Sequence, residues 1–121
     1  MAQIKYNLGD LGKEVYSTNE TVIGTWIDGK TIYRRCVANN VSGSGMSVTL
    51  YVDLSNVDKI IEFHGTGILG SVELPLHYSD AGTYFDIYRS GGTLTIAIRD
   101  SGRSATLTKA FIFMDYTKIN E

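Results

Sequence analysis

The residues of this chain that could carry out chemistry are few, and none stands in a recognised catalytic spacing. The sequence contains no G-x-S-x-G, no P-loop and no H-E-x-x-H. Its carboxylates gather in turns, where aspartate commonly bonds its own backbone. A glycosidase pair among them stays open, because the separation of two carboxylates is a tertiary property. We therefore predict no catalytic residues and no enzymatic activity.

Metal and cofactor sites are not predicted either. His64 and His77 are the only histidines, and neither has a Cys or a second His at ligand spacing. A two-histidine site would need a carboxylate brought in by the fold. The glycines of Gly65-Thr-Gly-Ile-Leu-Gly70 are spaced as in a dinucleotide loop, but they follow an expected strand and open no helix. We interpret this fragment as a turn-rich loop.

Aromatic side chains beside polar ones give the sequence its one binding signal. A tyrosine can stack on a sugar ring with its face and bond hydroxyls with its tip. The loop-bordering residues of this kind, which we take as candidate carbohydrate contacts, are His77, Tyr78, Asp80, Tyr84, Tyr88 and Arg89. The alternative is that these rings complete the core or rim of the domain. For Trp26, in the middle of a hairpin, we expect the core.

Composition narrows the function classes. The 11 basic and 13 acidic residues give a formal net charge of −2, and only Arg34 and Arg35 are adjacent basic residues. Nucleic-acid binding usually needs a concentrated basic surface, so we expect none. No apolar run approaches the roughly 18 residues of a membrane span, so we expect no membrane insertion. The single cysteine, Cys36, can form no internal disulfide.

The elements that must position these residues begin with a hairpin at Asp28-Gly29. Two β-rich runs flank this pair, which is preferred in two-residue type I′ turns. That turn would place Ile27 opposite Lys30. One face of the hairpin would then carry Val22, Trp26, Tyr33 and Val37, and the other Ile23, Ile27 and Ile32. We expect both faces to be buried, in one domain or partly against another chain.

The rest of the chain is predicted to form strands joined by turns. Alternating apolar residues indicate strands at Val48–Leu54, Val72–Leu76, Thr93–Asp100 and Ser104–Tyr116. Ile60–His64 and Thr83–Tyr88 are shorter candidates, and Pro75 marks an edge strand. Ser42–Gly45 and the glycines from Gly65 to Gly70 are expected to be loops. About eight strands predict an all-β, two-sheet antiparallel β-sandwich, jelly-roll-like, with an immunoglobulin-like sandwich or small barrel as alternatives.

Four sequence elements resemble a known family. The run YSTNETVIGTWIDGKTIYR at Tyr16–Arg34, then IIEFHG at Ile60–Gly65, LPL with YS around Tyr78, and DYTK from Asp115 occur in this order. They are similar to the C-terminal tip or receptor-binding domain of bacteriophage tail and fibre proteins. The resemblance covers nearly the whole chain from Tyr16 onward. It implies a β-sandwich tip domain at residues 16–121, with residues 1–15 as an arm or linker.

The same resemblance implies the partners and the place of action. We expect a homotrimer in the virion, at a tail or fibre tip, assembled in the host cytoplasm beside other tail proteins. The implied role is host attachment by binding a cell-surface glycan without catalysis. Ile23, Ile27 and Ile32 are then candidates for the subunit interface. A trimerisation cap or capsid or tail decoration without sugar binding is the alternative function, and a polysaccharide hydrolase or esterase is a third.

Overall fold

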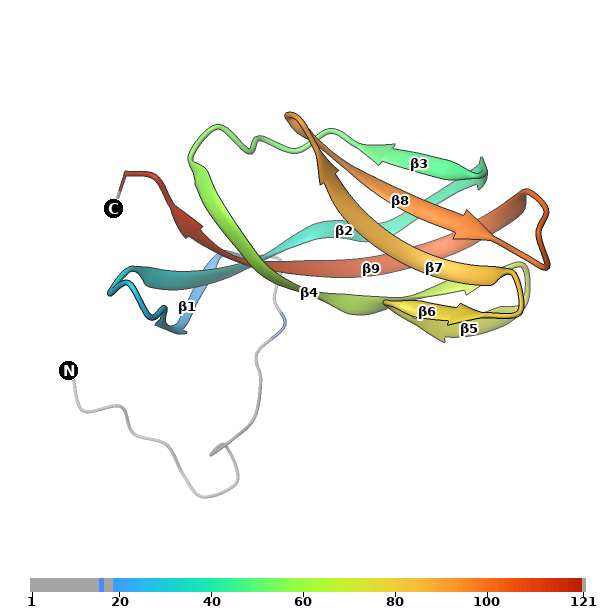
Figure 1. The fold of residues 1–121 in the computed structure, drawn as a ribbon, viewed down its shortest axis with the longest axis horizontal. Coiled ribbons are helices and arrows are strands. Elements are labelled where there is room, and N and C mark those ends of the chain that lie inside the picture. The colour runs from blue at the N-terminus through green and yellow to red at the C-terminus, as the bar shows by residue number, and fades with distance from the viewer. Residues whose placement is uncertain (1–15, 17–18, 121) are drawn as a thin grey trace, which may run out of the picture.

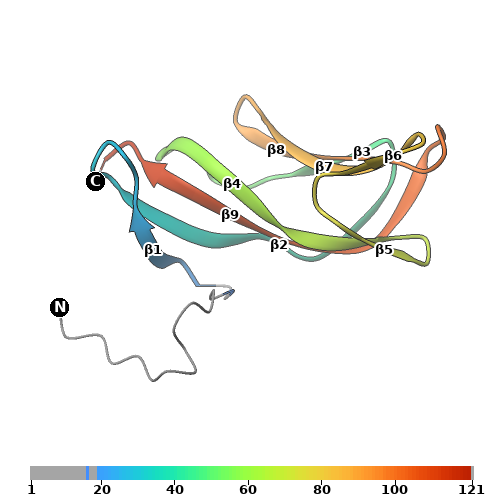
Figure 2. The same ribbon diagram turned by 60° about the horizontal axis from the view of Figure 1, so that its bottom comes forward.

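The described part of the chain forms a sandwich of two antiparallel β-sheets without a helix. The computed structural model describes residue 16 and residues 19–120. The strands are β1 (Thr21–Thr25), β2 (Thr31–Gly45), β3 (Ser47–Leu50), β4 (Val57–Leu69), β5 (Val72–Pro75), β6 (Tyr78–Asp80), β7 (Thr83–Ser90), β8 (Thr93–Arg99) and β9 (Ala105–Lys118). The larger sheet has the order β1-β2-β9-β4-β5 and the smaller β3-β8-β7-β6 (Figures 1 and 2). The predicted sandwich is confirmed, and the expected arm at 1–15 lies outside the described residues.

Strands far apart in the sequence pair at the centre of the larger sheet and at one edge of the smaller sheet. β2 pairs with β9 and β3 pairs with β8, so the first part of the chain wraps around the last, as in a jelly roll. β4–β5 and β6–β7–β8 pair with their neighbours in sequence. Pro75 lies on the edge strand β5, as predicted, where its missing N–H leaves no gap in a ladder.

The core lies between the sheets and follows the alternation of the strands. Leu94, Ile96 and Ile98 of β8 are fully buried, which confirms the apolar face predicted for this run. On β9 the side chains of Ile112 and Met114 are also fully buried, whereas the intervening Phe113 is half-buried on the outer face of the larger sheet. No described helix is long and apolar enough to span a membrane.

The hairpin at Asp28-Gly29 exists, but its predicted type I′ turn is wrong. The Gly29 N–H donates to the Trp26 carbonyl at 2.9 Å, and the Trp26 N–H donates to the Lys30 carbonyl at 2.8 Å. Only Gly29 has a positive φ, 88°, so a three-residue loop replaces the two-residue one. The Asp28 side chain accepts from the Lys30 N–H at 3.0 Å, which favours this wider turn.

The wider turn shifts the register and moves Trp26 to the other face. Gly24 now lies opposite Ile32, so Trp26 shares a face with Ile32 instead of Tyr33. Trp26 is half-buried and lies outside the core cluster, contrary to our expectation. Type I′ geometry occurs instead at Ala81-Gly82, where φ is 51° and 85°.

Several strand limits differ from the prediction because glycine was interpreted as loop. β2 runs through Ser42–Gly45, and β4 runs through Gly65 and Gly67. A Cβ on Gly65 would lie 2.1 Å from the Phe111 carbonyl oxygen, and one on Gly67 would lie 2.7 Å from the Phe85 ring. These glycines are therefore required by close packing, within the larger sheet at Gly65 and between the two sheets at Gly67, and not by a turn. Conversely, β3 ends at Leu50, short of the predicted Leu54.

The hairpin end of the larger sheet extends beyond the smaller sheet. Both ribbon views show β1, the start of β2 and the C-terminal end on this projecting part (Figures 1 and 2). Ile27 is 92% exposed and Val22 64%, because no second sheet covers them. Within the described residues, the hairpin therefore does not bury both of its apolar faces.

Candidate functional site

A groove of about 420 Å³ opens between the two sheets, where β4 passes β7. Its lining combines an apolar floor with polar and aromatic side chains. The lining residues are Ile60, Ile61, Glu62, Phe63, His77, Ile87, Tyr88 and Arg89. A site of this size and mixed character is typical of small-ligand binding.

Two strand edges border the groove. β5 pairs with β4 only from Thr66 to Leu69, so the earlier part of β4 has no neighbour on the side away from β9. β6 likewise pairs with β7 only up to Phe85, which leaves the later part of β7 as an edge. Such edges carry backbone N–H and C=O groups that no ladder occupies. The groove thus offers main-chain donors and acceptors beside its side chains.

The structure brings three of the six predicted contacts into this groove and separates the other three from it. His77, Tyr88 and Arg89 line the groove. Tyr78 packs against the core, because it lies opposite the fully buried Phe85. Asp80 lies on β6 and Tyr84 on β7. Neither side chain lines the groove or either of two smaller hollows beside the segment that joins β3 to β4.

His77 is held in an unusual conformation at the groove. Its φ is 64°, in the left-handed region that few residues other than glycine adopt. Its Nδ1 lies 2.7 Å from Oδ1 of Asp86, and the same oxygen accepts the Ile87 N–H at 2.8 Å. Backbone strain at a side chain fixed by its neighbour is a feature found often at functional sites. Asp86 was missed because its approach to His77 depends on the β6–β7 pairing.

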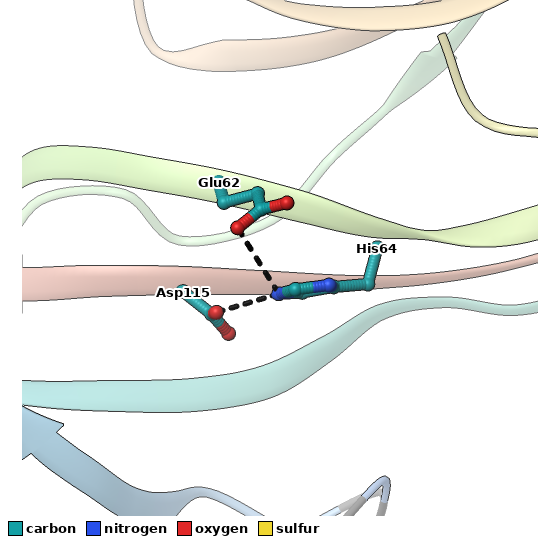
Figure 3. Close-up of side chains that lie close together, drawn as sticks. All are labelled: Glu62, His64 and Asp115. Carbon is teal, nitrogen blue, oxygen red and sulfur yellow. Dashed lines mark hydrogen bonds and ion pairs between the residues drawn. The ribbon is translucent and has the colours of Figure 1, made fainter. Parts of the chain in front are cut away.

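A second cluster lies on the outer face of the larger sheet. Glu62 and His64 of β4 point toward Asp115 of β9 (Figure 3). His64 Nε2 lies 2.6 Å from Asp115 Oδ2 and 4.0 Å from Glu62 Oε1. From β2, Arg34 holds the carboxylate with both Nε, at 2.6 Å, and Nη2, at 2.9 Å. Three adjacent strands therefore contribute to one polar network.

The network keeps Asp115 ionised inside the protein. Burial alone would raise the pKa of this carboxyl group, but the hydrogen bonds from Arg34 and His64 lower it below its usual range. Tyr16 lies over the cluster, with the Arg34 guanidinium 4.7 Å from its ring centroid. The network is thus shielded by the residue where the described chain begins.

The donor set does not fit a metal ion, although its ligand atoms lie within 4.8 Å of one another. Arg34 Nη2 lies 3.0 Å from His64 Nε2, so a cation bound there would meet the guanidinium charge directly. The same guanidinium occupies both oxygens of Asp115. We interpret the cluster as structural. Sequence alternation could have placed Glu62 and His64 on one face, but not Arg34 and Asp115 beside them.

The predicted subunit-interface residues lie on the projecting hairpin. Ile27 is almost fully exposed, Ile23 is 39% exposed, and Ile32 is half-buried. Within the described structure, Val22, Ile23 and Ile27 are therefore exposed apolar side chains that another chain could cover.

No family model, curated protein or solved structure matches this chain.

Proposed function

We propose that this chain is a non-catalytic carbohydrate-binding domain and that the groove between β4 and β7 is its sugar site. The observation that carries the proposal is the convergence of Tyr88, His77 and Arg89 with Glu62 in one groove. Tyr88 is half exposed, so its ring is available for stacking against a sugar. The charged side chains and the strand edges supply donors and acceptors for hydroxyl groups.

The setting that we propose is a phage tail or fibre tip that attaches to the host surface. Its support is the resemblance of the sequence elements at Tyr16–Arg34, Ile60–Gly65 and around Tyr78 to such domains. The two-sheet sandwich agrees with the architecture that this resemblance implies. An antibody against the domain should label the tail or fibre tip of the virion in electron micrographs; label on the capsid alone would contradict the placement.

The sugar site is tested with matched tyrosine variants on a glycan array and by calorimetry. Tyr88→Ala should weaken binding about tenfold, because it removes the stacking ring. Tyr51→Ala is the control, since Tyr51 is also a tyrosine, is 87% exposed, and lines neither the groove nor the hollow next to it. Absence of glycan binding, or an equal loss in both variants, would overturn the proposal. Release of reducing sugar from bacterial walls would contradict the non-catalytic role.

A trimerisation cap is the second candidate function, favoured by the exposed hairpin. Val22, Ile23 and Ile27 are apolar side chains that the described structure leaves exposed to water. The two functions are compatible, because three weak sugar sites on one axis would bind with greater avidity than one.

A further inference from the structure

Two more hollows continue from the groove around the same end of the sandwich. The middle hollow, of about 390 Å³, is lined by Val52, Asp53, Leu54, Ser55, Val57, Arg89, Gly92 and Ile119. The end hollow, of about 160 Å³, is lined by Glu20, Arg35, Asp53, Asn56, Val57, Tyr116 and Lys118. Residues of the segment that joins β3 to β4 line both hollows, and Figure 1 shows the course of this segment.

Shared residues place the groove and the two hollows next to one another in a row, which we call the path. Arg89 lines both the groove and the middle hollow. Asp53 and Val57 line both the middle and the end hollow. The groove and the middle hollow therefore meet at Arg89, and the middle and end hollows meet at Asp53 and Val57.

The wall of this path is held in place before any ligand arrives. Within the β3–β4 segment, Asp53 Oδ1 accepts the Ser55 N–H at 2.9 Å, and the Asp53 carbonyl accepts from Arg35 at 2.7 Å. Asn56 joins the same segment to the C-terminal end, since its Oδ1 accepts the Asn120 N–H at 2.9 Å. A preformed path lowers the entropy cost of binding a long ligand.

The charges along the path are mixed, since the lining contains three carboxylates (Glu62, Asp53 and Glu20) and three strong bases (Arg89, Arg35 and Lys118). In the end hollow the Glu20 carboxylate accepts from the Tyr116 hydroxyl and from Lys118 Nζ, the latter at 2.9 Å. Burial and this hydrogen bond raise the pKa of Tyr116, so its hydroxyl remains protonated at neutral pH. Because the lining holds as many carboxylates as cations, it does not favour a polyanion, whereas hydroxyl groups can both donate to and accept from a mixed lining. The lining therefore suits an uncharged, hydroxyl-rich chain.

We infer that the groove, the middle hollow and the end hollow bind successive units of one linear, uncharged polysaccharide. The ligand is then at least three sugar units long and not a single sugar. This inference rests on the proposed sugar site in the groove and extends it to the length and charge of the ligand.

A blocked middle hollow distinguishes this inference from a single sugar site. Gly92 lines that hollow without a positive φ, and a Cβ there meets no atom within 4 Å, so Gly92→Phe places a ring in open space. Gly24→Phe on β1 is the matched control, because its nearest contact is an ordinary 3.9 Å and it lines none of the hollows. Probes are disaccharides and hexasaccharides of the cello-, chito- and malto- series and the neutral wall polysaccharide of a Gram-positive bacterium.

The expected result is a length-dependent loss. At least one series should bind the original protein more tightly as the hexasaccharide, and Gly92→Phe should weaken that binding about tenfold while leaving the disaccharide within about twofold. Backbone amide shifts should extend from the groove to Asn56. Equal affinity for both lengths, or shifts confined to the groove, would overturn the inference and leave the proposed function standing. Binding of none of the probes would overturn both.

Discussion

At the residue scale, Asp115 is the buried negative charge of the polar network on the outer face of the larger sheet. It is only 5% exposed, and Arg34 beside it 4%. Asp115→Asn should lower the free energy of unfolding by about 3 kcal/mol, because it leaves the buried guanidinium without a counter-charge. Urea denaturation at pH 7 measures this loss. The double variant Arg34→Met with Asp115→Leu is the control, and it should lose less than Asp115→Asn alone.

The same carboxylate gives stability a defined dependence on pH. Its pKa is lowered in the folded protein from the ordinary 3.8, so the unfolded chain binds the proton more readily. The stabilisation is therefore complete above the unfolded value and is lost as pH falls through the folded one. Between pH 6 and pH 3, the original protein should lose more stability than Asp115→Asn. Parallel curves for the two proteins would show that Asp115 makes no such contribution.

The sequence could place Tyr88, His77 and Arg89 near loops, but it could not show that these three line the groove and Tyr78 does not. Tyr78 and Tyr88 are both tyrosines near turns, yet only pairing opposite Phe85 turns Tyr78 into the core. The Asp115 network was not predicted at all. Its residues come from β2, β4 and β9. They meet only because these distant strands pair in a particular register, which cannot be read from the sequence.

At the scale of elements, Gly67 allows β4 to pack against Phe85 of β7. Gly67→Ala would place a methyl group 2.7 Å from the buried Phe85 ring and should cost about 1–3 kcal/mol through overpacking. Thermal unfolding of the variant gives the measure. Gly92→Ala is the control, since it enters open space and should be neutral or slightly stabilising. Equal midpoints for the two variants would show that Phe85 yields without cost.

The turn between β6 and β7 is occupied by a residue that does not suit it. Ala81 has a φ of 51° in a two-residue loop with Gly82. Ala81→Asn should raise stability by about 0.5–1 kcal/mol, because asparagine is preferred at this position of a type I′ turn. Chemical denaturation gives the value. Ser71→Asn is the comparison: the structure gives Ser71 no positive φ, and we expect no gain there.

Period-two alternation predicted most strands, and several of the wrong strand limits have one cause. Leu94, Ile96 and Ile98 alternate and are buried as expected. Glycine, by contrast, signals a turn in the sequence, whereas Gly65 and Gly67 serve close approach of backbone and ring within β4. The same ambiguity hid the length of β2 beyond Val41. Composition alone does not distinguish these two uses of glycine.

At the scale of the whole molecule, the projecting hairpin bears on the oligomeric state. Ile27→Lys should convert the proposed trimer to a monomer, because it places a charge in the apolar contact. Light scattering measures the mass. Stability at low concentration should change by less than about 0.5 kcal/mol, since Ile27 is 92% exposed in the single chain. A monomeric mass for the original protein would remove the trimer and leave Val22 and Ile27 unexplained.

The central place of β9 sets an order of events during synthesis. β9 lies between β2 and β4, yet it is translated after every other described strand. The pair Tyr33 and Tyr116 must close a loop that contains nearly all of the sandwich. On the ribosome, β2 and β4 therefore wait with open edges until residues 105–118 leave the exit tunnel. The nascent chain is exposed to aggregation in that interval, and a chaperone that covers β-edges would act there.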